Sequence, residues 1–173
     1  MVSFDSGKTA LVTIDLMDRI VALPLSPRPG TEVLERSIEL ADAFRKAGAT
    51  VVAVRVERPN LPEQPHGSDL AADLVQPGDH VVVKRSIGAF LNTDLDEYLK
   101  QRGVDTIVFT GIATNLGVES TVRVASDLQY ELFLVEDAMT ARSPEEHQAA
   151  IKLNFPRFGT ICSTADVLAA LTT

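Results

Sequence analysis

Short apolar runs alternate with longer stretches of helical periodicity along the whole chain. The apolar runs, which are typical of buried strands, cover residues 10–14, 51–56, 81–84, 105–110, 132–135 and 160–162. Between them, hydrophobic positions recur every three to four residues, most clearly over residues 31–47. Because strands that alternate with helices form parallel sheets covered on both faces, we expect an α/β fold. The expected architecture is a three-layer α/β/α sandwich around about six parallel strands, Rossmann-like in layout.

Local signals define the ends of the expected helices. Gly48 follows the first long helical stretch and is a typical helix stop. The segment Ser143-Pro144-Glu145-Glu146 offers an N-cap serine, a proline at the first helical position and a glutamate three residues after the cap. No internal repeat, low-complexity tract or linker interrupts the order of elements. We therefore expect one domain spanning residues 1–173.

The acidic composition limits the classes of partner. The 173 residues include 24 acidic and 16 basic side chains, which gives a formal net charge of −8. Nucleic acids and anionic membranes attract basic surfaces, so we expect neither as a partner, whereas local arginines still permit an anionic small-molecule substrate. No apolar run approaches the ~20 residues of a membrane span, and the N-terminus lacks the pattern of a signal peptide. We expect a cytoplasmic protein.

Six of the nine prolines fall in the two loops that follow the first and second expected strands. They are Pro24, Pro27, Pro29, Pro59, Pro62 and Pro65. Both loops leave the carboxyl ends of strands, where open α/β sheets bind ligands, so one interpretation is a pre-shaped rim around a pocket. Simple stiffening of two surface connections is an equally good interpretation.

Two charged residues stand at the ends of expected strands. Asp15 follows the run 10–14, and Lys84 ends the run 81–84. From position alone, Asp15 is as compatible with capping the next loop as with acid–base chemistry. Lys84 is equally compatible with extending its ammonium group to water. Burial would raise the pKa of Asp15 and a nearby cation would lower it, so its working protonation state depends on its neighbour.

The segment Thr110-Gly-Ile-Ala-Thr-Asn-Leu-Gly-Val-Glu-Ser-Thr121 follows an expected strand and opens an amphipathic stretch. It resembles the signature of the isochorismatase-like (cysteine hydrolase) family, usually Gly-Ile/Val-Ala-Thr-x-x-Cys-Val-x-x-Thr. Ala10–Met17 is similar to the first-strand motif of that family, and Val83–Phe90 to its lysine motif. The resemblance covers the chain from Ala10 to about Leu168, and the three motifs together are fairly specific.

The resemblance implies roles for individual residues. It makes Asp15 the acid/base and Lys84 its electrostatic partner. It also implies a cis peptide bond between Ile112 and Ala113, and an anion cradle formed by the N–H groups of Ala113 and Gly117 at a helix N-terminus. The residues expected to contact the substrate are Ala113, Thr114, Asn115, Arg58 and Phe90. For Arg58, a solvated loop arginine is the alternative.

Gly117 occupies the position at which most members of the resembled family carry the nucleophilic cysteine. No thiolate is therefore present at position 117 to form a thioester intermediate. Cys162 lies outside every motif and is expected to be a packing residue. True isochorismatases resemble this chain in having a small residue at that position, and they cleave a vinyl ether. The expected function is hydrolysis of a small, anionic, enol-ether-like metabolite with Asp15 as general acid. The alternative is a catalytically silent small-molecule-binding or structural member of the family.

The sequence offers no motif for a metal or a cofactor. The three histidines, His66, His80 and His147, show no paired ligand spacing, and no nucleotide-binding motif occurs. We therefore expect neither a metal nor a cofactor. The resembled family usually forms homo-oligomers, which implies that this chain self-associates.

Overall fold

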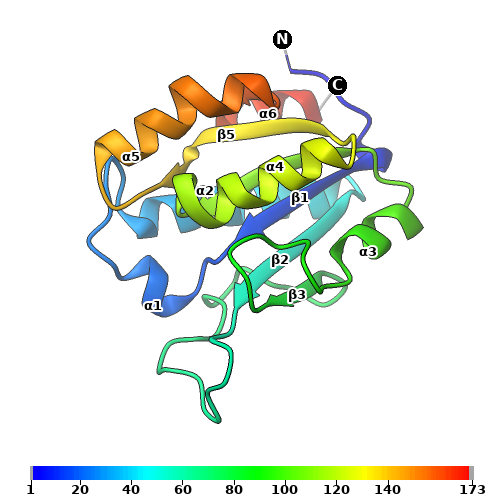
Figure 1. Cartoon of the computed structure of the whole chain (residues 1–173). Coiled ribbons are helices and arrows are strands. Elements are labelled where there is room, and N and C mark those ends of the chain that lie inside the picture. The colour runs from blue at the N-terminus through cyan, green and yellow to red at the C-terminus, as the bar shows by residue number, and fades with distance from the viewer. Residues whose placement is uncertain (1, 172–173) are drawn as a thin grey trace.

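The computed structural model describes residues 2–171 as a six-stranded sheet between two layers of helices (Figure 1). All strands are parallel, in the order β3-β2-β1-β4-β5-β6. The strands are β1 (Thr9–Ile14), β2 (Thr50–Val56), β3 (His80–Lys84), β4 (Thr106–Ile112), β5 (Glu131–Thr140) and β6 (Thr160–Cys162). The expected fold class, including the parallel sheet of six strands, is confirmed.

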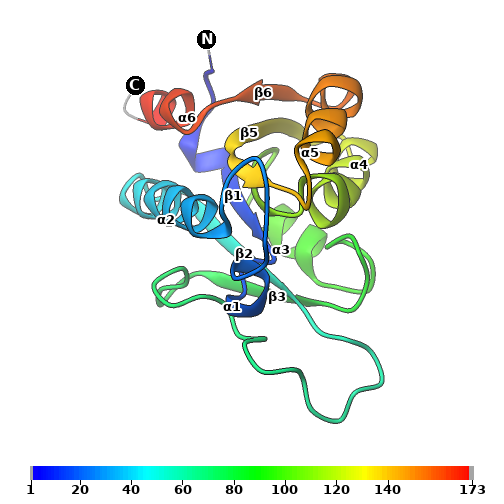
Figure 2. The ribbon, with the colours of Figure 1, turned by 90° about the vertical axis from the view of Figure 1, so that its left-hand side faces the viewer.

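The helices divide between the two faces of the sheet, as the end view in Figure 2 shows. On one face lie α2 (Gly30–Lys46) and α6 (Thr164–Leu171); on the other lie α3 (Leu95–Gln101), α4 (Glu119–Asp127) and α5 (Pro144–Ala149). Short helical segments complete the chain: η1 (Ser6–Lys8), α1 (Asp18–Val21), η2 (Thr114–Val118), η3 (Ala150–Asn154) and η4 (Phe155–Arg157). Within residues 2–171, no helix is both long and apolar enough to cross a membrane.

Alternation along the central strand explains the two layers. Ala10, Val12 and Ile14 of β1 pack in the core cluster under α3 and α4, whereas Leu11 packs with Phe44 of α2. A strand buried on both faces is largely apolar on both, which is why the run 10–14 shows no regular polar alternation and only Thr13 in it is polar. Both faces of the sheet are therefore buried, and the loops at its carboxyl edge lie where open α/β sheets bind ligands.

Most elements match the expected bounds to within two residues, but β5 and α1 depart further from the expectation. The expected strand at 132–135 continues in β5 to Thr140. Its pairing with β4 shifts register, since Phe109 pairs with Leu134 but Gly111 pairs with Met139. The short helix α1 was not predicted, since four residues are too few to show a helical period. At Ser143 the predicted N-cap is confirmed: its Oγ accepts from the Glu146 N–H at 3.2 Å.

Candidate active site

Asp15 lies directly after β1, at the carboxyl edge of the sheet. Its φ of 55° is in the left-handed region, which Asp tolerates better than most residues. The Asp15 N–H donates to the Val54 carbonyl at 2.9 Å, and the Asp15 carbonyl accepts from the Met17 N–H at 2.8 Å. These bonds turn the chain out of the strand and hold the carboxyl group at the wall of a cavity.

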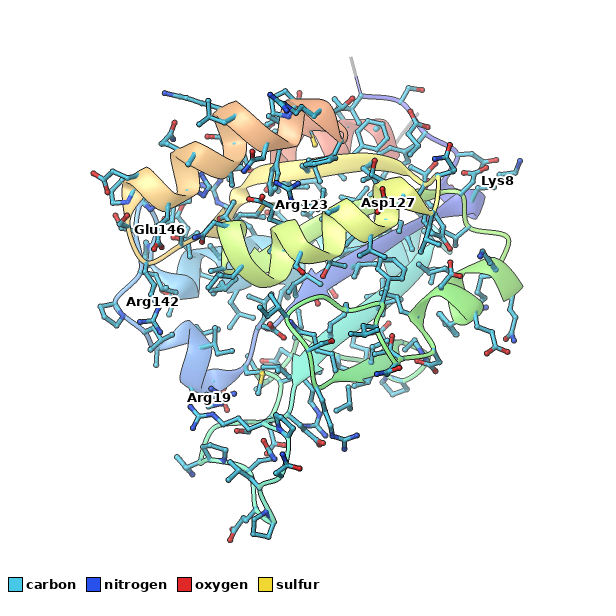
Figure 3. All side chains as sticks on the ribbon, in the orientation of Figure 1. Lys8, Arg19, Arg123, Asp127, Arg142 and Glu146 are labelled. Carbon is cyan, nitrogen blue, oxygen red and sulfur yellow. The ribbon has the colours of Figure 1, made fainter. Side chains whose placement is uncertain are left out.

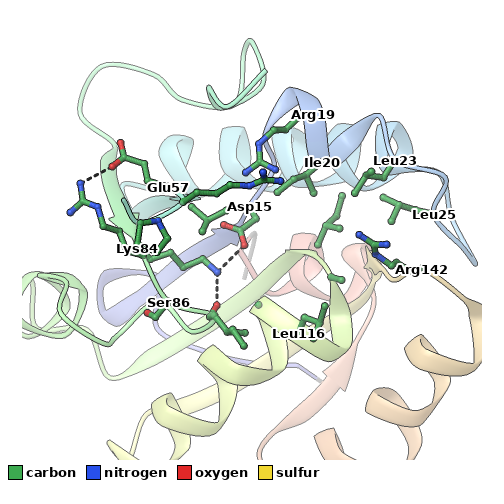
Figure 4. A pocket seen from close by; sticks show the side chains of 18 residues that line it. Asp15, Arg19, Ile20, Leu23, Leu25, Glu57, Lys84, Ser86, Leu116 and Arg142 are labelled. Carbon is green, nitrogen blue, oxygen red and sulfur yellow. Dashed lines mark hydrogen bonds and ion pairs between the residues drawn. The ribbon is translucent and has the colours of Figure 1, made fainter. Parts of the chain in front are cut away.

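Lys84 reaches Asp15 across the intervening strand. It ends β3, which is separated from β1 by β2, and only its extended side chain can bridge the two strand spacings of about 4.8 Å each. Its Nζ lies 2.8 Å from Asp15 Oδ2 and also donates to the carbonyl of Ile87 (Figure 4). The Lys84 side chain is 2% exposed, so this is a buried ion pair.

Burial dominates the protonation of Asp15. It raises the pKa of the carboxyl group from 3.8 to about 6, although the nearby charges of Lys84 and then Arg19 act to lower it. Lys84 occupies Oδ2, whereas Oδ1 is buried and has no hydrogen-bond partner within residues 2–171. Asp15 therefore titrates at a pH of about 6 at the wall of the cavity, which suits a group that donates a proton.

The loop after β4 brings backbone groups to the same place. Gly111 has a φ of 126°, and a Cβ built there would lie 2.2 Å from the Ile14 carbonyl oxygen, so only glycine fits this close approach to β1. The following Ile112–Ala113 peptide bond is cis. Within the described residues, the Ala113 N–H donates to no oxygen. A Cβ built on Gly117 would lie 3.0 Å from Asp15 Oδ2 and 3.2 Å from Lys84 Nζ, so its backbone faces the ion pair directly.

These groups border a cavity of about 410 Å³, within the range of small-molecule sites. Its charged lining consists of Asp15, Glu57, Lys84, Arg19, Arg58, Arg85 and Arg142, and its apolar lining includes Ile20, Leu23, Leu25, Ile112 and Leu116 (Figure 4). Glu57 pairs with Arg55 and Arg85 at 2.8 and 2.7 Å, and the pKa of its carboxyl is lowered, most strongly by Arg85. The cavity is thus lined by cationic side chains together with apolar ones.

The residues expected at the site fall into two groups. Asp15, Lys84, Arg58, Ala113 and Gly117 line the cavity. Three residues expected to contact the substrate do not line it: Thr114, Asn115 and Phe90. Phe90 instead packs on the core, with its ring 6.3 Å from that of Tyr130.

Thr114 instead anchors the loop that carries Ala113 and Gly117. Its Oγ1 and Nδ1 of His147 are joined by a hydrogen bond of 2.8 Å, and both side chains are completely buried. Burial, and then the charge of Arg28, lowers the pKa of His147 to about 4, so the imidazole is neutral near pH 7. His147 could not be selected from the sequence, because a single histidine within a helical stretch is usually a packing residue.

We expect Thr114→Val to destabilise the protein by about 1–3 kcal/mol, because it leaves His147 Nδ1 buried without a partner. For a chain of this size each kcal/mol lowers the melting temperature by about 2–4 °C. Thermal unfolding followed by circular dichroism measures this effect. Thr160→Val, at an exposed position of β6, is the matched control and should change little. Equal melting temperatures for the two variants would contradict the anchoring role.

Three cavity arginines were not selected from the sequence: Arg19, Arg85 and Arg142. Arg19 belongs to the unpredicted helix α1, and Arg142 follows the unpredicted extension of β5. Figure 3 shows both at the end of the molecule opposite Lys8, which precedes the start of β1. Arg142 lies two residues after the end of β5, so its place at the carboxyl edge would have been apparent had that strand end been recognised.

Cys162 does not take part in the cavity. It lies in β6, its Sγ is 3.8 Å from the Leu134 carbonyl, and burial raises the pKa of its thiol to about 12. A thiol with that pKa stays protonated and unreactive, as expected for a packing residue. Within residues 2–171, no three His, Cys, Asp or Glu side chains gather as metal ligands would.

Comparison with known proteins places the chain among its relatives. The family described as "Isochorismatase domain" matches residues 9–166. An isochorismatase family protein of Bacillus subtilis, YwoC, is 40% identical over 96% of this chain and 95% of its own. A solved isochorismatase family protein from Burkholderia thailandensis superposes with a TM-score of 0.91 at 39% identity, covering 99% of this chain and 98% of that one. Ureidoacrylate amidohydrolase RutB of an Enterobacter species is 42% identical over 53% of this chain and 40% of its own.

Proposed function

This chain belongs to the isochorismatase family of hydrolases, and from that premise we propose that it hydrolyses a small anionic enol ether. Asp15 acts as the general acid, and Lys84 is its electrostatic partner. The N–H groups of Ala113 and Gly117 lie against the substrate. The observation that carries the proposal is the Asp15 carboxyl group, which lines the cavity, pairs with Lys84 and has a pKa raised to about 6.

Gly117 determines which chemistry is open to this site. In the family signature that the sequence resembles, the nucleophilic cysteine would stand at this position, and here no side chain is present. Ser86 is the one hydroxyl side chain that lines the cavity within the described residues, and its Oγ donates to the Gly88 carbonyl at 2.9 Å. Without a thiolate or an activated hydroxyl, covalent acyl transfer has no nucleophile, whereas protonation of an enol ether needs none.

The proposed reaction consumes one water and needs no other reactant. Asp15 in its acid form donates its proton to the terminal methylene carbon of the enol ether, and the adjacent carbon becomes an oxocarbenium centre. Water adds to that centre and loses a proton, which restores the acid form of Asp15. The resulting hemiketal breaks its bond to the bridging oxygen and gives a ketone and an alcohol. An enolpyruvyl ether would yield pyruvate in this way.

Release of pyruvate from isochorismate by the purified protein tests this proposal. We expect pyruvate to accumulate in proportion to enzyme, as measured by coupling to lactate dehydrogenase. Absence of pyruvate would exclude isochorismate as the substrate. If other enolpyruvyl ethers also gave no pyruvate, the proposed activity would be refuted, and a small-molecule-binding role without catalysis would be the better explanation.

The pH dependence of turnover should follow the acid form of Asp15. Because the acid form is the active one and its pKa lies at about 6, kcat/KM should be highest below pH 6 and fall about tenfold per pH unit well above it. Initial rates between pH 5 and pH 8 measure the profile. A rate that rises with pH over this range would indicate that Asp15 acts as a base instead.

The remaining expectations stay predictions. They are a single domain over residues 1–173, a cytoplasmic location, self-association, and independence of metals, cofactors, nucleic acids and membranes. Sedimentation of the purified protein would test self-association.

A further inference from the structure

Two loops that follow neighbouring strands pair with each other at the cavity. Residues 16–19, after β1, run alongside residues 67–71 of the long loop after β2. The Ala71 N–H donates to the Leu16 carbonyl at 2.9 Å, and the Arg19 N–H donates to the Gly67 carbonyl at 3.0 Å. An antiparallel bridge joins Met17 and Leu70. The backbone of Arg19 is therefore fixed by a segment about fifty residues further along the chain.

The same loop orients the Arg19 side chain. Ser68 is 7% exposed, and its Oγ accepts from Arg19 Nε at 3.0 Å. Gly67 makes the approach possible: its φ is 73°, and a Cβ there would lie 3.1 Å from the Arg19 backbone nitrogen. With Nε engaged, the two terminal NH2 groups of the guanidinium remain, and within residues 2–171 neither has a hydrogen-bond partner.

The charge around this arginine is reversed relative to the whole protein. The chain carries 24 acidic and 16 basic residues, yet the cavity is lined by five cationic side chains and two carboxylates. Of those carboxylates, Asp15 pairs with Lys84 and Glu57 with Arg55 and Arg85. Within the described residues, Arg19 forms no ion pair. Its position beside Asp15 is visible in Figure 4.

We propose that Arg19, oriented by Ser68, binds the carboxylate of the substrate through its two terminal NH2 groups. Such a fork matches the two oxygens of a carboxylate and gives bidentate recognition. Arg19 and Asp15 line the same cavity, so a carboxylate held by Arg19 shares that cavity with the carbon that Asp15 protonates. This assignment rests on the proposed function.

Equilibrium binding of pyruvate and of its neutral analogue pyruvamide tests the assignment without any turnover. Isothermal titration at low salt should show pyruvate binding at least tenfold more tightly than pyruvamide. Arg19→Gln should remove that preference and leave pyruvamide binding unchanged. Arg157→Gln, at an exposed position in η4 outside the cavity, removes the same charge and should keep the preference.

Two further variants separate orientation from charge. Ser68→Ala keeps the arginine but removes its orienting acceptor, so pyruvate should bind several-fold more weakly. Ser68→Thr retains the hydroxyl and should restore the affinity. Arg19→Lys keeps the charge without the fork and should give an intermediate affinity. Equal affinity of pyruvate for wild type and Ser68→Ala would remove Ser68 from the assignment.

The outcomes distinguish this assignment from the proposed reaction. Should Arg19→Gln keep the preference for pyruvate over pyruvamide, the carboxylate is held by another cation such as Lys84, and the assignment fails. It also fails if wild type binds neither compound, or both equally. A third result is that the protein binds pyruvate in preference to pyruvamide through Arg19 and yet cleaves no enol ether. That result would support the carboxylate site and refute the proposed reaction.

Discussion

Asp15→Asn should lower kcat for enol-ether hydrolysis by about 10²–10⁴-fold at pH 6, the usual contribution of a general acid. The asparagine amide fills the same space at the end of β1 but has no proton of suitable acidity to give. The measurement is pyruvate release under saturating substrate, with circular dichroism to verify the fold, because the amide leaves Lys84 without its counter-charge.

The matched control for this variant is Asp18→Asn, three residues along the chain. Asp18 is exposed in α1 and does not line the cavity, so the same chemical change should leave kcat near the wild-type value. If Asp15→Asn retained wild-type turnover, the proton would have to come from another group, and the assignment of Asp15 as the acid would be lost.

Lys84→Met should have the largest effect on stability. Removing one partner of a buried ion pair typically costs about 3–5 kcal/mol, because the other charge is left in an apolar environment. Here the remaining group is Asp15. Since Lys84 lowers the pKa of Asp15, its removal should raise that pKa further above its present value of about 6. Asp15 can then escape the penalty by taking up a proton, which limits the loss at low pH.

The sign of the pH dependence follows from linkage. The pKa of Asp15 is higher in the folded than in the unfolded state, so between the two values the folded state binds more protons and stability falls as pH rises. The deficit of Lys84→Met relative to wild type should therefore be larger at pH 8 than at pH 5. Urea unfolding at both pH values measures it.

Lys100→Met is the control for the lysine variant. Lys100 pairs with Asp96 on the surface of α3, with its side chain 60% exposed, and exposed pairs contribute about 1 kcal/mol or less. If Lys84→Met were as stable at pH 8 as Lys100→Met, the ion pair with Asp15 would contribute no more to the free energy of unfolding than an exposed pair.

The order of strands and helices could be predicted from the sequence because a strand buried on both faces leaves an uninterrupted apolar run. Asp15 directly follows such a run and Lys84 ends one, but position left their roles open, and it was the resemblance to the family motifs that assigned them. Their contact at 2.8 Å could not be predicted from the two runs, because it depends on the order of strands in the sheet. Strand β2 lies between the strands of Asp15 and Lys84, and neither run specifies that arrangement.

The parts of the site that sequence reasoning missed lie where periodicity is lost. Arg142 follows the extension of β5, in which Glu136 and Asp137 interrupt the apolar pattern that defines a buried strand. Arg19 owes its orientation to Gly67 and Ser68, in a loop without secondary structure whose course no local pattern predicts. Loops at the carboxyl edge are specified by their contacts with one another, and these appear only in three dimensions.

Hydrolysis of isochorismate in water enriched in oxygen-18 tests the central claim most directly, because it locates the bond that breaks. If Asp15 protonates the enol-ether carbon, water adds to the pyruvyl carbon, and the bridging oxygen leaves with the alcohol. Mass spectrometry of the released alcohol should then show no oxygen-18. Oxygen-18 in the alcohol would mean that water attacks the ring carbon, and it would contradict general-acid catalysis at the enol ether by Asp15.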